Sequence, residues 1–184
     1  AHMLAISVFL FLIPLSKHMH LVMAVPNVFF HDAGPIARMR PLATGDDGKA
    51  VPLEDLDIDS FGVSTYNQYS WRQLIDGWSC TSCARCQDVC PAYASGKGLN
   101  PMQVIHDVRN YANDHAPILL SGGQPDETIL ERITEEAVWA CTTCNACVDV
   151  CPLYIEHVPK LTDLRRNAMM ETMEYPEVLN TAMG

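Results

Sequence analysis

The eight cysteines of this sequence fall into two copies of one pattern, and they are the residues best suited to chemistry. The copies occupy residues 80–91 and 141–152, and each reads C-x2-C-x2-C-x3-C-P. Thiolate sulfur is a soft ligand that binds metals well. Two-residue gaps let a short loop present three thiolates to one centre, so each copy is a candidate metal site.

The fourth cysteine of each copy follows after three residues and points away from its own loop. In proteins with two [4Fe–4S] clusters this cysteine binds the other cluster. The predicted ligands are Cys80, Cys83, Cys86 and Cys151 for a first cluster, and Cys141, Cys144, Cys147 and Cys90 for a second. A single C-x2-C pair also occurs in zinc sites. Two complete copies that use every cysteine indicate two [4Fe–4S] clusters, which carry electrons one at a time.

The composition narrows the possible partners. The 184 residues carry a net charge of −10, which excludes nucleic acid as a partner. Disulfides are disfavoured, because no basic region precedes the apolar start as in a secretory signal, and the cysteines are clustered. A reducing compartment is expected instead. The sequence has no nucleophile–base pair, phosphate loop or dinucleotide fingerprint, so it predicts an electron relay without a substrate site, and leaves open whether the chain is part of an enzyme.

Residues 1–31 are strongly apolar, with Lys17 as their one Lys, Arg, Asp or Glu. The run before residue 17 is short for a bilayer crossing, which takes about 20 residues. It fits either a helix buried in a protein core or the end of a transmembrane helix, and Pro14 favours the membrane. Arg38 and Arg40 follow the segment. By the positive-inside rule, they and Lys17 predict a cell-membrane protein whose cysteine region lies on the cytoplasmic side.

Two histidines of the apolar segment have a spacing suited to haem. His2 and His20 are 18 positions apart, which is five turns of a straight helix and a rise of about 27 Å. Both would face one side of the helix, at opposite ends of a membrane, as axial ligands of two b-type haems do. The alternative is that His18, His20 and His31 are interfacial residues that flank a membrane helix. Both interpretations stay open on spacing alone.

The remaining chain divides into a linker at 32–64 and a helical domain at 65–184. Ser70 and Gln73 form a capping box before an apolar face of Trp71, Leu74, Ile75 and Trp78. Asn100 and Pro101 start a second helix. Further helices are expected from Pro125 and from about Pro159 into the methionines that end at Met173. Because no strand alternation is visible, the predicted fold class is mainly α.

The helical insert between the motifs resembles the alpha-helical ferredoxin domain of succinate dehydrogenase and heterodisulfide reductase. A longer series of segments narrows the resemblance. They are residues 14–20, 26–30 and 61–63, Trp71, Asp76, the two cysteine motifs, and residues 98–101, 156–157 and 165–166. In this order they resemble the membrane-bound heterodisulfide-reductase-type Fe–S oxidoreductases, which include proteins that link electron-transfer flavoprotein to the quinone pool.

The resemblance implies a function and a context. His2 and His20 match the last haem-ligating helix of a domain similar to the nitrate reductase gamma subunit, with His18 as a rival for the second position. The earlier membrane helices and the later Cys-Cys-Gly domains are missing, so the chain is expected to be the central part of a longer protein. The expected function is an electron-transfer module of a quinone-linked oxidoreductase, with an electron-transfer flavoprotein or a Cys-Cys-Gly domain as redox partner. The alternative is a soluble ferredoxin-like adaptor that docks through its apolar N-terminus.

Overall fold

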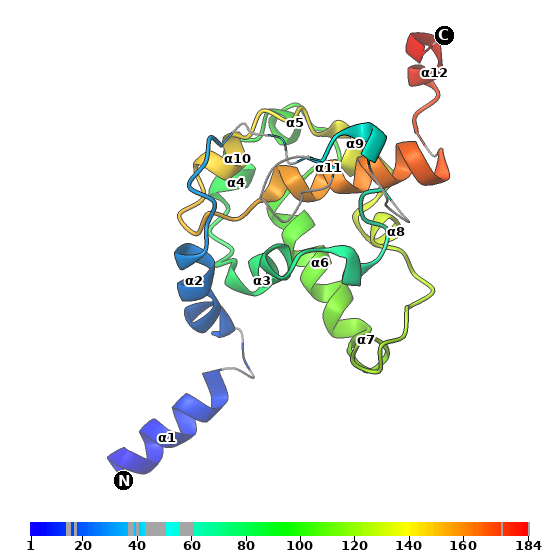
Figure 1. Cartoon of the computed structure of the whole chain (residues 1–184). Coiled ribbons are helices and arrows are strands. Elements are labelled where there is room, and N and C mark those ends of the chain that lie inside the picture. Colours follow the sequence, from blue (N-terminus) through cyan, green and yellow to red (C-terminus); the bar gives the residue numbers. More distant parts are fainter. Residues whose placement is uncertain are drawn as a thin grey trace.

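The computed structural model describes residues 1–13, 16, 18–36, 39, 41–42, 51–55, 61–173 and 175–183. Within these ranges the chain is mainly helical and contains no strand, as expected (Figure 1). The longer helices are α1 (His2–Leu12), α2 (Met19–Phe29), α3 (Trp71–Ser79), α6 (Pro101–Asp114) and α11 (His157–Asn167). The shorter helices are α4 (Arg85–Asp88), α5 (Pro91–Ala94), α7 (Ala116–Leu120), α8 (Ile129–Ile133), α9 (Glu135–Ala140), α10 (Ala146–Asp149) and α12 (Val178–Met183).

Helix α6 lies at the centre of the cysteine-bearing domain and packs against α3, α8 and α11. Its side chains Val104, Ile105, Val108 and Tyr111 are buried, as their spacing predicts. Asn100 caps the helix by accepting hydrogen bonds from the backbone N–H groups of residues 102 and 103. This central helix carries the core against which the two cysteine motifs are held.

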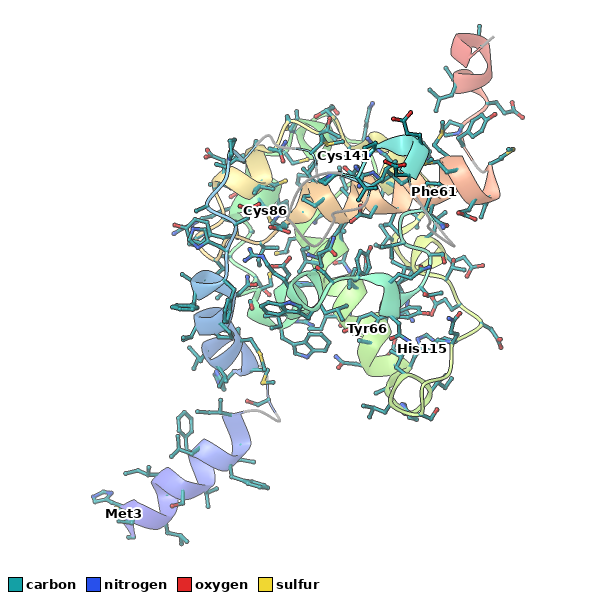
Figure 2. All side chains as sticks on the ribbon, in the orientation of Figure 1. Met3, Phe61, Tyr66, Cys86, His115 and Cys141 are labelled. Carbon is teal, nitrogen blue, oxygen red and sulfur yellow. The ribbon has the colours of Figure 1, made fainter. Side chains whose placement is uncertain are left out.

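The apolar N-terminus forms two helices in place of the single expected one. α1 ends at Leu12 and α2 begins at Met19, and no helix in the described part of the chain is long and apolar enough to span a bilayer. Every side chain of α1 is exposed, and Figure 2 shows Met3 on this helix projecting from the rest of the molecule. The expectations placed on Pro14, Lys17, Arg38 and Arg40 concern residues outside the described ranges, as does most of the linker, including 43–50 and 56–60.

Helix α3 buries the opposite face from the one its sequence suggests. The capping box of Ser70 and Gln73 forms as predicted, but Trp71 is 56% exposed. The buried side is polar and carries Arg72, Asp76 and Ser79, because α2 packs along it. Tertiary contact with α2 therefore outweighs the apolar periodicity of this short helix.

Two other helix boundaries differ from the sequence expectation. α8 begins at Ile129 rather than near Pro125, because Thr128 supplies the cap. α11 begins at His157, before Pro159, which fits in its first turn. The methionine region continues α11 as a π-helical turn, Ala168–Thr172. The linker contains a short 3-10 turn, Leu53–Asp55.

Candidate iron–sulfur centre

The two cysteine motifs fold in the same way. In the first, Ser82 and Ala84 have left-handed backbone angles with φ of 56° and 63°, and α4 follows directly. In the second, Thr143 and Asn145 have φ of 56° and 61°, and α10 follows. A non-glycine residue in this region costs roughly 1–2 kcal/mol, and such strain is typical of ligand sites. The repeated strain shows that both loops are shaped for the same purpose.

The cysteines line two separate cavities. Cys80, Cys83, Cys86 and Cys151 line the first cavity, and Cys90, Cys141, Cys144 and Cys147 line the second. Each cavity thus combines three cysteines of one motif with the fourth cysteine of the other. α4 and α10 pack against each other, which brings the two motifs together for this exchange.

The chemistry of these donor sets fits an iron–sulfur cluster. Burial raises the pKa of the Cys86 and Cys147 thiols to about 12, and the neighbouring cysteines raise it further. Four thiolates crowded in such a cavity need a cationic core to balance them. Among the described residues, no three His, Cys, Asp or Glu side chains are placed to share one metal ion. Thiolates that each bind a different iron of a cube are not required to share one.

Each cavity has a buried and an exposed side. Cys86, Cys90 and Cys147 are buried, whereas Cys83 and Cys144, the second cysteines of the two motifs, are exposed. The exposed sulfurs give each cavity an edge at the molecular surface where a redox partner can approach.

His157 lies at both cavities, and the sequence analysis did not assign it a role. The residue lines the first and the second cavity and is 1% exposed. Its Nδ1 is 3.0 Å from the carbonyl oxygen of Ile155. Burial, and secondly the charge of Lys160, lower the pKa of His157 to about 4. A neutral ring therefore stands where the two cavities meet; its position at the start of α11 was the available signal.

His106 contacts one cysteine directly and was also missed. Its Nε2 lies 3.7 Å from Cys80 Sγ and 3.0 Å from the hydroxyl oxygen of Ser82. The side chain projects from α6, one residue after the fully buried Ile105. Burial, and secondly the charge of Arg109, lower the pKa of His106. A histidine beside the apolar face of α6 was the sequence signal.

A buried polar cluster anchors the segment that follows Cys151. Asn27 donates to Asp76 Oδ1 at 3.0 Å and to the carbonyl of Leu153 at 2.9 Å. Asp76 also pairs with Lys160, and both side chains are fully buried. Arg72 donates to the carbonyl of Tyr154 at 3.2 Å. Residues from α2, α3 and α11 thus hold the loop that delivers a cysteine to the first cavity.

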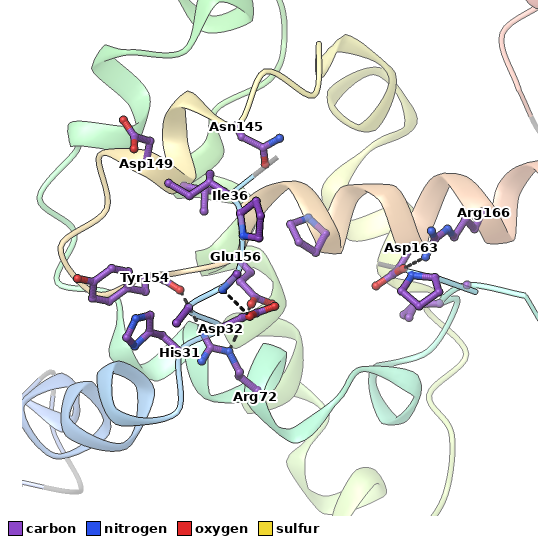
Figure 3. Close-up of a pocket in the computed structure, with 18 of the residues that line it drawn as sticks. His31, Asp32, Ile36, Arg72, Asn145, Asp149, Tyr154, Glu156, Asp163 and Arg166 are labelled. Carbon is purple, nitrogen blue, oxygen red and sulfur yellow. Dashed lines mark hydrogen bonds and ion pairs between the residues drawn. The ribbon is translucent and has the colours of Figure 1, made fainter. Parts of the chain in front are cut away.

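A larger cavity lies beside this cluster and is separate from the two cysteine cavities (Figure 3). His31 stacks on Tyr154 at its edge, with ring centroids 4.2 Å apart, and Arg72 lies 3.4 Å from a Glu156 carboxylate oxygen. His31 therefore packs against the domain that holds the cysteines.

The haem expectation rested on a straight helix that the structure does not contain. His2 belongs to α1 and His20 to α2, and Ser16 and His18 between the helices are not helical. Five helical turns therefore do not connect the two histidines, and the argument that they share one face is wrong. His18 and His20 lie near each other, with ring centroids 6.3 Å apart.

Comparison with known proteins agrees with the cysteine geometry. Residues 72–152 match the family model described as a 4Fe-4S dicluster domain. The chain is a relative of iron–sulfur oxidoreductases. It is 31% identical to EtfAB:quinone oxidoreductase of Syntrophomonas wolfei, over 95% of this chain and 26% of that protein. It is 31% identical to the probable iron-sulfur-binding oxidoreductase FadF of Bacillus subtilis, over 90% of this chain and 27% of that protein.

A third relative is one of the polypeptides of a heterodisulfide reductase. The chain is 32% identical to this component of the ferredoxin:CoB-CoM heterodisulfide reductase of Methanosarcina mazei, over 56% of this chain and 53% of that protein. The chain spans about a quarter of the length of the first two relatives. No solved structure matches it. These relatives confirm the resemblance to the heterodisulfide-reductase type and identify an iron–sulfur electron-transfer module.

Proposed function

We propose that this chain holds two [4Fe–4S] clusters and relays single electrons between a haem or quinone site in the membrane and a cytoplasmic partner or catalytic domain. The observation that carries the proposal is the pair of four-cysteine cavities that share His157. Cys80, Cys83, Cys86 and Cys151 would hold one cluster, and Cys141, Cys144, Cys147 and Cys90 the other. When bound, each cluster would take up and release one electron at a time.

The contacts of α2 support an order for the relay. Ser79, which precedes Cys80, donates to the carbonyl of Met23 at 2.9 Å. Asn27 donates to Leu153, two residues after Cys151. Both contacts join α2 to ligands of the first cavity. We therefore assign the first cavity to the side of the apolar N-terminus and the second to the side of the soluble partner.

Membrane attachment, quinone and haem are parts of this proposal that rest on fewer observations. α1 exposes an uncharged apolar surface, and one relative is named as an EtfAB:quinone oxidoreductase. The proposal places the chain at the cell membrane with its cysteines on the cytoplasmic side. Haem b at His2 and His20 would need partner helices from elsewhere. The competing proposal is an adaptor that docks on a protein through the same helices.

The test is a crossed set of cysteine variants. Wild type is expected to contain about eight non-haem irons with matching sulfide, and coupled [4Fe–4S]+ EPR signals after dithionite reduction. C151A removes a ligand of the first site, so C151A and C80A/C151A should each lose one cluster and keep the other. C90A/C151A should lose both clusters.

Two outcomes would contradict the proposal. If C141A/C151A lost only one cluster, the cysteines would group by motif and the exchange would be wrong. Zinc in place of iron in the wild type would remove the electron-transfer function altogether.

A further inference from the structure

The two cavities are not equivalent in the hydrogen bonds that reach their sulfurs. On the first side, His106 Nε2 lies 3.7 Å from Cys80 Sγ, a distance within the reach of a hydrogen bond to sulfur. On the second side, the matching Cys141 Sγ accepts from the backbone N–H of Thr143 at 3.4 Å. The charged side chain nearest that motif, Arg165, donates instead to the carbonyl oxygens of Val138 and Cys141. A side-chain N–H directed at a sulfur thus distinguishes the first cavity.

The chemistry of the site determines which nitrogen of His106 carries the proton. A metal-bound thiolate is an acceptor, so Nε2 must be protonated to contact Cys80 Sγ favourably. The Ser82 hydroxyl oxygen, 3.0 Å from Nε2, can accept from the same N–H or orient the ring. The left-handed φ of 56° at Ser82 places this hydroxyl beside the imidazole. The ring is therefore held between the sulfur and the loop that carries it.

Hydrogen bonds to cluster sulfur shift the reduction potential in a known direction. Reduction adds one negative charge, and an N–H donor stabilises the more negative form. Further donors act on the first site, since the backbone N–H groups of Leu153 and Ile155 lower the pKa of the Cys151 thiol, against the larger effect of burial. The first cavity is therefore the richer in donors at the ligands that these contacts reach.

We propose that His106 is a positioning residue that donates its Nε2 hydrogen to Cys80 Sγ and raises the reduction potential of the first cluster above that of the second. This inference rests on the proposed function, because it requires both clusters. The higher potential lies on the side that α2 contacts, so it favours electron movement from the partner side toward the apolar N-terminus.

The test is an EPR-monitored redox titration of the two clusters in three variants. H106F keeps a ring of similar size without the donor, and the first cluster should shift to lower potential while the second stays unchanged. H106Q restores an amide N–H donor and should return the first potential toward that of the wild type. H115F changes another histidine at the end of α6, distant from the cysteine contacts, and should leave both potentials unchanged.

The signal of each cluster is assigned with C151A and C90A. An unchanged first potential in H106F would overturn the inference, as would an equal shift of both clusters, which would indicate a general change in the fold. If H106F takes up no cluster, pulsed EPR of the reduced wild type labelled with 15N-histidine decides the matter. A nitrogen coupling that disappears in H106Q supports the contact, and its absence in the wild type overturns it. A wild type without iron and sulfide would contradict the proposed function instead.

Discussion

Gly62 shows how a single residue can fix the approach of two segments. Its φ is +72°, and a Cβ there would lie 2.2 Å from the carbonyl oxygen of Asp163 and 2.5 Å from the backbone nitrogen of Asn167. The next residue, Val63, donates its N–H to that same Asp163 carbonyl at 3.0 Å. The segment at 61–63 therefore packs directly on the backbone of α11, and only glycine allows this distance.

G62A is expected to lower the free energy of unfolding by more than about 3 kcal/mol, because overpacking adds to the cost of a left-handed alanine. G96A is the matched control. Its φ is +78°, but no atom lies within 4 Å of the added Cβ, so the loss should be about 1–2 kcal/mol. Denaturation followed by far-UV circular dichroism with the clusters bound measures both. Equal losses would show that the contact with α11 is not tight.

At the scale of elements, a buried ion pair connects α3 to α11. Asp76 and Lys160 are both 0% exposed, and Asp76 also accepts from Asn27 of α2 and from the N–H of Glu156. A charge buried without its partner is costly, whereas a matched pair is tolerated because its hydrogen bonds are complete. These contacts explain why the polar side of α3 faces inward.

K160M should destabilise the fold by about 3–5 kcal/mol, because it leaves the Asp76 carboxylate buried and unpaired by a cation. D76N/K160M should recover a large part of this loss, since no net charge is then buried. D114N is the control, because its pair with Arg132 is partly exposed and should contribute less than about 1 kcal/mol. Additive losses in the double variant would contradict a coupled pair.

At the scale of the whole molecule, an acidic cysteine domain carries an apolar extension. Leu4 and Phe11 of α1 are 72% and 71% exposed, and the chain as a whole has a net charge of −10. Exposed apolar surface of this kind marks a site of contact with a membrane or another protein. The proposed function assigns that surface to a bilayer.

The wild-type chain is therefore expected to enter the detergent phase in a detergent phase-separation assay, and L4E/F11E should move it to the aqueous phase. V178E changes an apolar residue that is 81% exposed on α12 and should leave the partition unaltered. A wild type that stays in the aqueous phase would favour the adaptor that docks on a protein.

The sequence by itself determined the features that depend on near neighbours. The cysteine spacing indicated the type of ligand site, because three thiolates on one short loop are a local arrangement. Ser70 and Asn100 predicted helix starts correctly, since a cap acts within one turn. The apolar period of α6 predicted its buried face, because that helix is long enough for the period to be unambiguous.

Tertiary structure alone decided the features that join distant segments. It broke the N-terminal helix after Leu12, turned the polar face of α3 inward against α2, and brought His106 and His157 to the cysteines. A polar side chain is buried only where a partner from another element satisfies it, and the sequence around it does not reveal that partner. For this reason the kind of chemistry was visible in the sequence, whereas the residues that tune it emerged from the packing of α6 and α11 around the two cavities.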